Sequence, residues 1–206
     1  HGKSSAIKAE GDFSLSAIAK IMSAAILQLS AGNTFIICSS SLGTNIVAEM
    51  LTDAVLPKGL FMAGPCIVGK GFEMDKMVLP AADVTAVFAE NLPDKIVHQY
   101  AVETSISTEP GDKELFLADY YAVKGNFRSS LYASIAAGTY SDEIELLQKI
   151  NVPVCIVFGK DEKVVNTDYL DNAPLNLWNK TIYKIPGASH LVNIDAPEPF
   201  NELLAA

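Results

Sequence analysis

The sequence predicts an α/β fold, with a mainly parallel sheet flanked by helices. Short apolar runs typical of buried strands alternate along the chain with helical patterns at three- and four-residue spacing. A serine stands between the first such strand and its helix, and an aspartate and a histidine each follow a later strand. Because the carboxyl ends of parallel strands meet at one edge of a sheet, we expect these three side chains to lie together.

The predicted elements begin with an amphipathic helix that starts near Ser14 and ends at Gly32. The apolar run 34–37 then predicts a strand, and residues 45–51 predict the helix that follows it. The other expected core elements are strands at 58–64, 152–160 and 180–185 and helices at 141–150 and 197–205. These alternations favour a parallel sheet.

Residues 66–125 interrupt the alternation. Three helical patterns follow one another there with no strand between them, at 82–91, 94–103 and 113–121. A helical insertion of this kind is typical of a lid that shields a reaction from water. The chain is therefore expected to comprise a first core part at 1–65, a helical lid at 66–125 and a second core part at 126–206.

Composition excludes several classes of partner. The chain has 206 residues, enough for one well-filled domain, and half of them are hydrophobic. A formal net charge of −9 argues against nucleic acid or an anionic membrane as a partner. No apolar stretch approaches the ~20 residues that span a bilayer.

Cysteine usage predicts a reduced, cytoplasmic protein. There are three cysteines, Cys38, Cys66 and Cys155, and two of them fall at or inside predicted buried strands. The sequence contains neither a CxxC pair nor an HExxH motif, so we expect no metal and no cofactor. The oligomeric state is left open.

Ser41 is the candidate nucleophile. It lies between a predicted strand and a predicted helix, and it alone of three consecutive serines has a glycine, Gly43, two positions later. A nucleophile elbow needs this layout because the sharp turn lifts the serine Oγ above the sheet edge. The alternative is an ordinary helix N-cap.

Asp161 and His190 are the candidate acid and base. Asp161 follows the strand at 152–160, although the neighbouring Glu162 could be confused with it. His190 follows the last predicted strand, whereas His1 is terminal and His98 lies in a helical pattern. In the expected triad His190 accepts the serine proton and Asp161 orients the imidazole. The backbone N–H of Leu42 would donate to the oxyanion.

The order serine, aspartate, histidine is the order of the α/β-hydrolases. The chain resembles that superfamily over its whole length, in particular the lid-bearing esterase and lactonase branch and, most closely, the N-acyl-homoserine lactone hydrolases of this type. The segments that carry the resemblance are 159–162, 176–178, 187–190 and 196–200. The resemblance implies that Tyr100, in the lid, lines the substrate site, although a packed lid aromatic is the alternative.

The chain departs from the family pattern at two residues. Ser39 and Ser189 stand where the family usually has glycine. Residues 1–4 resemble the end of the G-H-G-x-S turn that follows the fourth strand of these proteins. The first strands and one oxyanion donor are therefore expected to be absent from this sequence.

The resemblance and the triad together predict hydrolysis of a small carboxylic ester or lactone through an acyl-enzyme, without a cofactor. The apolar residues of the lid would suit an acyl chain. Two alternatives stay open: a non-catalytic ligand-binding protein that keeps the fold, and an amidase or peptidase.

Overall fold

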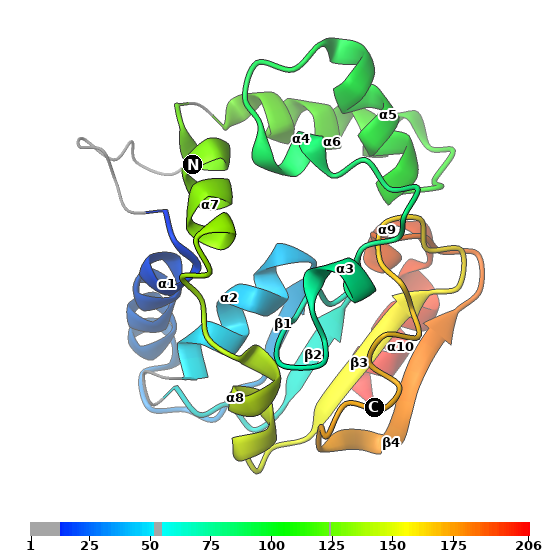
Figure 1. Ribbon diagram of the computed structural model, residues 1–206. Helices are drawn as coiled ribbons and strands as arrows, with labels where there is room; N and C mark the ends of the chain where they lie inside the picture. The colour runs from blue at the N-terminus through cyan, green and yellow to red at the C-terminus, as the bar shows by residue number, and fades with distance from the viewer. Residues whose placement is uncertain (1–12, 52–54, 124) are drawn as a thin grey trace.

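The centre of the protein is a four-stranded parallel sheet. The structure is a computed structural model that describes residues 13–51, 55–123 and 125–206 (Figure 1). Its strands, in spatial order, are β1 (Ile37–Ser40), β2 (Leu60–Ala63), β3 (Val154–Gly159) and β4 (Leu177–Ile185). Each neighbouring pair is parallel. The predicted parallel sheet with flanking helices is thus confirmed.

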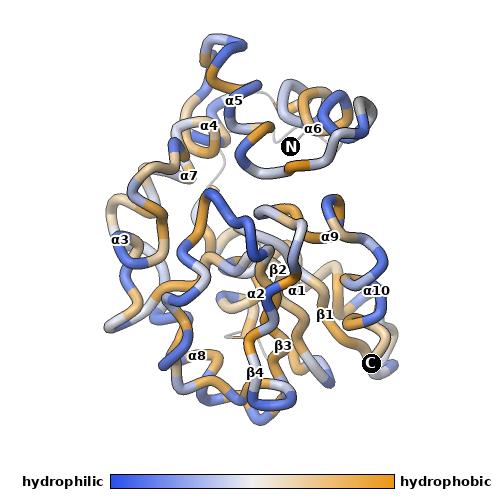
Figure 2. Tube along the Cα trace, turned by 90° about the vertical axis from the view of Figure 1, so that its right-hand side faces the viewer, coloured by the Kyte–Doolittle hydropathy of each residue, from blue (hydrophilic) through white to orange (hydrophobic). Residues whose placement is uncertain are grey.

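Alternation along the central strands divides the core into two layers. In β2, Leu60 and Met62 belong to the cluster on one face of the sheet, and Phe61 and Ala63 belong to the cluster on the other. All six residues of β3 are buried, which is why this strand is a continuous apolar run. In Figure 2 the central strands β2 and β3 are correspondingly coloured mostly as hydrophobic.

Helices cover both faces of the sheet. The larger cluster includes side chains of α1 (Leu15–Ser30), α2 (Leu42–Met50) and α8 (Glu143–Lys149). The smaller cluster includes side chains of α9 (Val192–Asp195) and α10 (Pro197–Ala205). Helix α1 begins where its sequence predicts, because Ser14 caps it by accepting a hydrogen bond from the N–H of Ala17 at 3.2 Å.

The elements between β2 and β3 are helical throughout the described part of the chain. They are α3 (Met74–Met77), α4 (Thr85–Phe88), α5 (Asp94–Thr104), α6 (Pro110–Ala122) and α7 (Phe127–Ala136), followed by α8. Figure 1 shows α4, α5 and α6 grouped at one end of the molecule, beyond the sheet. The prediction of a helix over 82–91 was too long, since only one turn forms there, and α7 was not predicted.

β1 begins at the last residue of the predicted strand, 34–37, and therefore contains Ser39 and Ser40. Pairing with β2 sets this register, which joins Ile37 to Leu60 and Ser40 to Ala63. Cys38 is exposed, contrary to the expectation of a buried strand position, because β1 is the edge strand of the described sheet.

Among the described residues, no helix has the length and apolar content needed to cross a membrane.

Candidate active site

The polar residues singled out in the sequence lie at one edge of the sheet. Ser41 directly follows β1, Asp161 and Glu162 follow β3, and His190 follows β4. Parallel strands bring their carboxyl ends to the same edge, where ligands bind in open α/β sheets. The topology therefore brings together groups that are far apart in the chain.

Ser41 occupies the sharp turn between β1 and α2. Its φ of 51° and ψ of −129° lie outside the regions that residues with a side chain normally adopt. A Cβ at Gly43 would meet the Cβ of Ser39 at 3.8 Å, an ordinary contact. Ser39 therefore fits beside Gly43 in this turn, and its Oγ donates to the carbonyl oxygen of Phe61 at 3.4 Å.

His190 bridges Ser41 and Glu162. Its Nε2 lies 2.8 Å from the Oγ of Ser41, and its Nδ1 lies 2.9 Å from Oε2 of Glu162. The side chains of His190 and Glu162 are only 2% and 1% exposed. With a proton on Nδ1, the imidazole donates to the carboxylate and leaves Nε2 free to accept the serine proton.

The expectation that Asp161 orients the histidine was wrong, because Glu162 makes that contact. Oδ2 of Asp161 instead accepts a hydrogen bond from the N–H of Gly187 at 3.0 Å on the surface. The N–H of Asp161 donates to the carbonyl oxygen of Ala188 at 2.9 Å. Asp161 thus closes the turn that leads into His190.

Glu162 is oriented by its own loop. Its Oε1 accepts hydrogen bonds from the N–H groups of Lys163 at 3.0 Å and Val164 at 2.8 Å. Val164 and Val165 are buried, so the chain turns inward at Val164, after the exposed Lys163 and two residues beyond Glu162. No local pattern in the sequence distinguishes Glu162 from its neighbour.

The other described histidine, His98, has no part in this arrangement. Nδ1 of His98 lies 2.7 Å from the carbonyl oxygen of Asp94 on the exposed side of α5. His1, together with the turn expected at residues 1–4, lies outside the described residues. His190 is therefore the histidine that meets Ser41.

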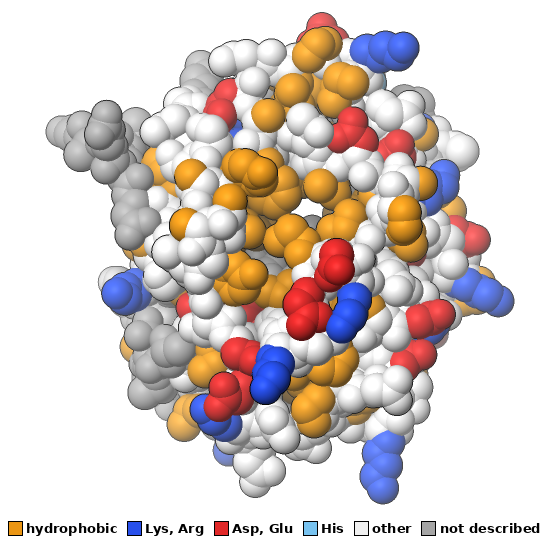
Figure 3. Space-filling view, in the orientation of Figure 1, with side chains coloured by type: hydrophobic (Ala, Val, Ile, Leu, Met, Phe, Trp, Pro, Cys, Tyr) orange, Lys and Arg blue, Asp and Glu red, His pale blue; other side chains and the backbone are white. Residues whose placement is uncertain are grey.

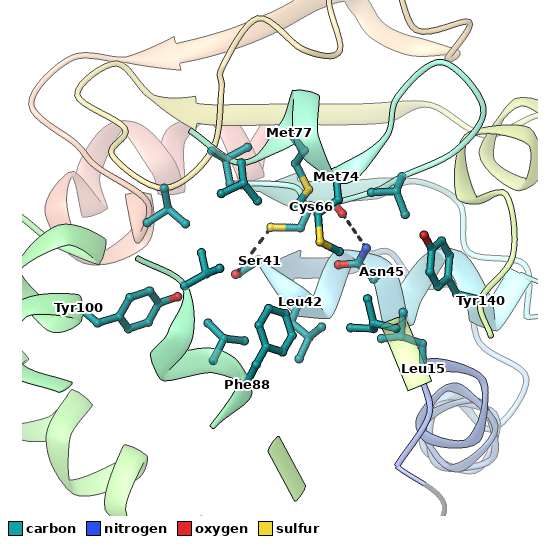
Figure 4. A pocket seen from close by; sticks show the side chains of 17 residues that line it. Leu15, Ser41, Leu42, Asn45, Cys66, Met74, Met77, Phe88, Tyr100 and Tyr140 are labelled. Atoms are coloured by element: carbon teal, nitrogen blue, oxygen red, sulfur yellow. Dashed lines mark hydrogen bonds between the residues drawn. The ribbon is translucent and has the colours of Figure 1, made fainter. Parts of the chain in front are cut away.

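Leu42 is the first residue of α2, so its N–H has no acceptor within the helix. The positive end of the helix dipole and this N–H lie next to Ser41, as an oxyanion donor requires. Tyr100 of α5 lines the same pocket as Ser41, and Figure 4 shows its oxygen directed into that pocket. Burial raises the pKa of Tyr100, so its hydroxyl is protonated and can donate a hydrogen bond.

The loop after β2, which the sequence did not single out, forms the floor of the site. Thr44 Oγ1 accepts from the N–H of Cys66 at 3.0 Å and donates to the carbonyl oxygen of Ser41 at 2.7 Å. Asn45 donates to the carbonyl oxygen of Cys66 at 2.7 Å. Tyr169 donates to the carbonyl oxygens of Pro65 and Ile67 at 3.1 and 3.0 Å. Cys66 is therefore held against the start of α2, and Tyr169 holds the residues on either side of it.

Cys66 is the thiol nearest the reacting groups, with its Sγ 3.9 Å from the Oγ of Ser41 (Figure 4). Burial raises the pKa of the Cys66 thiol to about 12. Because the thiolate and not the thiol is the nucleophile, Cys66 does not compete with Ser41 at neutral pH.

An apolar pocket of about 650 Å³, including space open to solvent, adjoins Ser41. Figure 3 shows hydrophobic side chains gathered around a hollow on this face. The apolar side chains that line it are Leu15, Leu42, Val68, Met74, Met77, Val78, Val84, Val87, Phe88, Ile135, Val164 and Val165. The members of this list that come from the expected lid at 66–125 are Val68, Met74, Met77, Val78, Val84, Val87 and Phe88. Within the described ranges, no three His, Cys, Asp or Glu side chains are placed to hold a metal ion.

No protein-family model matches the chain, and no curated protein sequence matches it either. Solved structures do match. An N-acyl homoserine lactonase, AidH, complexed with N-butanoyl homoserine is 25% identical, with a TM-score of 0.83 over 100% of this chain and 74% of that chain. The esterase RhEst1 from a Rhodococcus species is 18% identical, with a TM-score of 0.76 over 100% of this chain and 75% of that chain. A bromoperoxidase from Bacillus anthracis is 17% identical, with a TM-score of 0.71 over 99% of this chain and 77% of that chain.

Proposed function

The chain has the α/β-hydrolase fold, and on that premise we propose that it is a serine hydrolase of small carboxylic esters or lactones. The observation that carries the proposal is the position of His190. Its two ring nitrogens lie within 2.9 Å of a serine oxygen and a glutamate oxygen in a buried site. Serine, histidine and carboxylate in this relation are the groups that acyl transfer needs.

The reaction follows from the contacts. His190 Nε2 accepts the proton of Ser41 as Oγ forms a bond to the substrate carbonyl carbon. The Leu42 N–H donates to the oxyanion. When the tetrahedral intermediate collapses, the bond to the leaving oxygen breaks and His190 returns the proton to that oxygen. Water then attacks the acyl-enzyme as its proton passes to His190. The bond between the acyl carbon and Ser41 Oγ breaks, His190 returns the proton to Oγ, and the acid is released.

Glu162 is the proposed acid of the triad. It keeps the proton of the resting imidazole on Nδ1 and stabilises the imidazolium that forms when Nε2 is protonated. Its three acceptor contacts, two from backbone N–H groups and one from His190, hold it in one orientation. Asp161 is left with a structural role in the turn.

The pocket supports a substrate with an apolar acyl part. Aliphatic and aromatic side chains line it, while Ser41, Tyr100 and Asn45 supply polar groups. The lactonase of similar structure was crystallised with a butanoyl homoserine, and variants in which one serine or one glutamate is replaced by glycine were crystallised with hexanoyl homoserine lactone or its homoserine. An N-acyl homoserine lactone is therefore the substrate class we propose first.

We propose that residues 66–125 act as the lid between core parts at 1–65 and 126–206. Val84, Val87, Phe88 and Tyr100 from this segment line the pocket beside Ser41.

A cytoplasmic location, without a nucleic-acid partner, remains the prediction made from the cysteines and the charge.

The test is intact mass after exposure to a fluorophosphonate, which forms an adduct with activated serines. We expect one adduct on the parent chain, none on Ser41→Ala and one on Ser40→Ala. Ser40→Ala is the matched control because it removes the neighbouring hydroxyl and leaves Ser41 in place. Turnover of homoserine lactones, simple esters and amides is then compared.

The labelling and turnover results distinguish the three candidate functions. Labelling of Ser41 with lactone or ester turnover supports the proposal. A folded parent that takes no adduct contradicts it and favours a non-catalytic ligand-binding protein. Turnover of amides above esters favours an amidase or peptidase.

A further inference from the structure

The residues on both sides of His190 are bonded to the last turn of α5. The N–H of Leu191 donates to the carbonyl oxygen of Thr104 at 2.8 Å. Ser189 Oγ donates to the carbonyl oxygen of Glu103 at 2.8 Å. The serine that departs from the usual glycine before the histidine therefore supplies one of the links.

Asp195 joins the same two segments with a single carboxylate. Its Oδ2 accepts from the N–H of Ser189 at 2.7 Å. Its Oδ1 accepts from Ser105 Oγ at 2.5 Å and from the N–H of Ser107 at 3.0 Å. One oxygen therefore holds the loop that carries His190, and the other holds the segment that follows α5. Hydrogen bonds to a charged acceptor are stronger than neutral ones, more so where they are shielded from water.

Helix α5, which these hydrogen bonds join to the histidine loop, also reaches the substrate pocket. Thr104 Oγ1 donates to the carbonyl oxygen of Tyr100 at 3.0 Å, within the last turn of α5. Tyr100 lines the pocket beside Ser41. Thr104, Ser105, Ser189 and His190 are all buried, whereas Asp195 is half-buried. Helix α5 and the histidine loop are thus one hydrogen-bonded unit.

We propose that Asp195 is a positioning residue that ties His190 to α5, so that the helix lining the pocket and the general base keep a fixed relation. The inference rests on the proposed hydrolase function, in which a misplaced Nε2 slows proton transfer. In this role Asp195 makes no contact with substrate. Loss of the carboxylate should therefore lower kcat more than it raises KM.

The test uses Asp195→Ala and Asp195→Asn. Alanine removes all three contacts, whereas asparagine can still accept from Ser189 and donate to the Ser105 hydroxyl. We expect Asp195→Ala to lower kcat by about 10- to 100-fold, the size expected for a small displacement of a catalytic group. Asp195→Asn should recover part of that loss. Asp171→Asn is the matched control, because Asp171 is exposed and lies 4.0 Å from Lys184.

A second readout does not need turnover. In a Ser41→Ala background, hydrogen exchange is measured in peptides that cover 101–107 and 186–191. Ser105→Ala, which removes one contact on the α5 side, should speed exchange in the 186–191 peptide as well. This arm also serves if Asp195→Ala fails to fold.

The outcomes separate the two proposals. Unchanged kcat with only a lower melting temperature, or faster exchange confined to 101–107 in Ser105→Ala, would overturn the coupling. A parent chain without any hydrolase activity would overturn the proposed function, while the exchange data would still decide whether Asp195 couples the two segments.

Discussion

The Cβ that Gly64 lacks would lie 3.0 Å from Nδ1 of His190 and 3.0 Å from its carbonyl oxygen. Gly64 follows β2, and its φ of 51° is in the left-handed region that favours glycine. The imidazole therefore packs directly on backbone, at a place where a side chain would displace it.

The first prediction concerns this contact. Gly64→Ala should lower the rate of Ser41 labelling and of ester turnover by about 10²-fold, because the new methyl group moves the general base. Both rates are measured on folded protein. Gly138→Ala is the control for backbone strain, since its φ is 67° and nothing lies within 4 Å of its Cβ position. Equal effects of the two changes would contradict the steric explanation.

The second prediction separates the two adjacent acids. Two backbone N–H groups bind Oε1 of Glu162, so Glu162→Gln should turn its NH₂ group toward His190 and impose the wrong tautomer. We expect kcat to fall by about 10³- to 10⁴-fold, as in other triads with this type of change. Asp161→Asn should alter kcat by less than about tenfold, since it affects only a turn. Steady-state kinetics on one ester decide, and the reverse ranking would restore Asp161 as the acid.

The third prediction tests Tyr100 as a substrate-binding residue. Tyr100→Phe keeps the ring that packs 6.1 Å from Phe116 but removes the hydroxyl. Loss of one neutral hydrogen bond should lower kcat/KM for a homoserine lactone by about 2- to 12-fold. Labelling by a small fluorophosphonate should not change. Tyr140→Phe, which alters the opposite side of the pocket (Figure 4), should leave both rates near those of the parent.

The fourth prediction concerns a buried acid beneath the site. Oε2 of Glu143 accepts hydrogen bonds from Asn45 and from the N–H of Val68, both at 2.8 Å. Burial raises the pKa of Glu143 to about 8. The unfolded chain releases this proton near pH 4.5 and the folded chain near pH 8, so the group lowers stability as the pH rises through that window.

Glu143→Gln should remove this dependence. Between pH 5 and 8 the free energy of unfolding of the variant, relative to that of the parent, should rise by up to about 1.4 kcal/mol per pH unit. Urea unfolding at several pH values measures the difference. Parallel stability curves for the two proteins would show that Glu143 is ionised when folded.

The parts of the site that local pattern predicts are those that depend on one segment. Ser41 was identifiable because strand, turn and helix follow one another within the chain, and the turn is present with its positive φ. Tyr100 was expected to line the site only from the resemblance to a family; it does lie in the pocket, and its contact with substrate stays a prediction. Helix α10 begins and ends where its sequence predicts, since Pro197 suits a first helical turn.

Other features depend on contacts between segments. The choice between Asp161 and Glu162 is made by where the chain turns after β3, which is set by packing of Val164 and Val165. Gly64 and the loop after it matter because β2 lies beside β1 in the sheet, a neighbour relation that spacing does not encode. The link from α5 to the histidine loop joins Ser105 and Asp195, whose separation in the chain gave no signal.

The sequence by itself determined the class of fold and pointed to Ser41 and His190, which the structure places in hydrogen-bond contact at one edge of the sheet. Periodicity and turn chemistry act over a few residues, and they suffice for these conclusions. Only the tertiary structure decided which acid faces His190, which glycine makes room for it and which residues hold it to α5. Those relations are distances between side chains brought together by packing, and no local pattern specifies them.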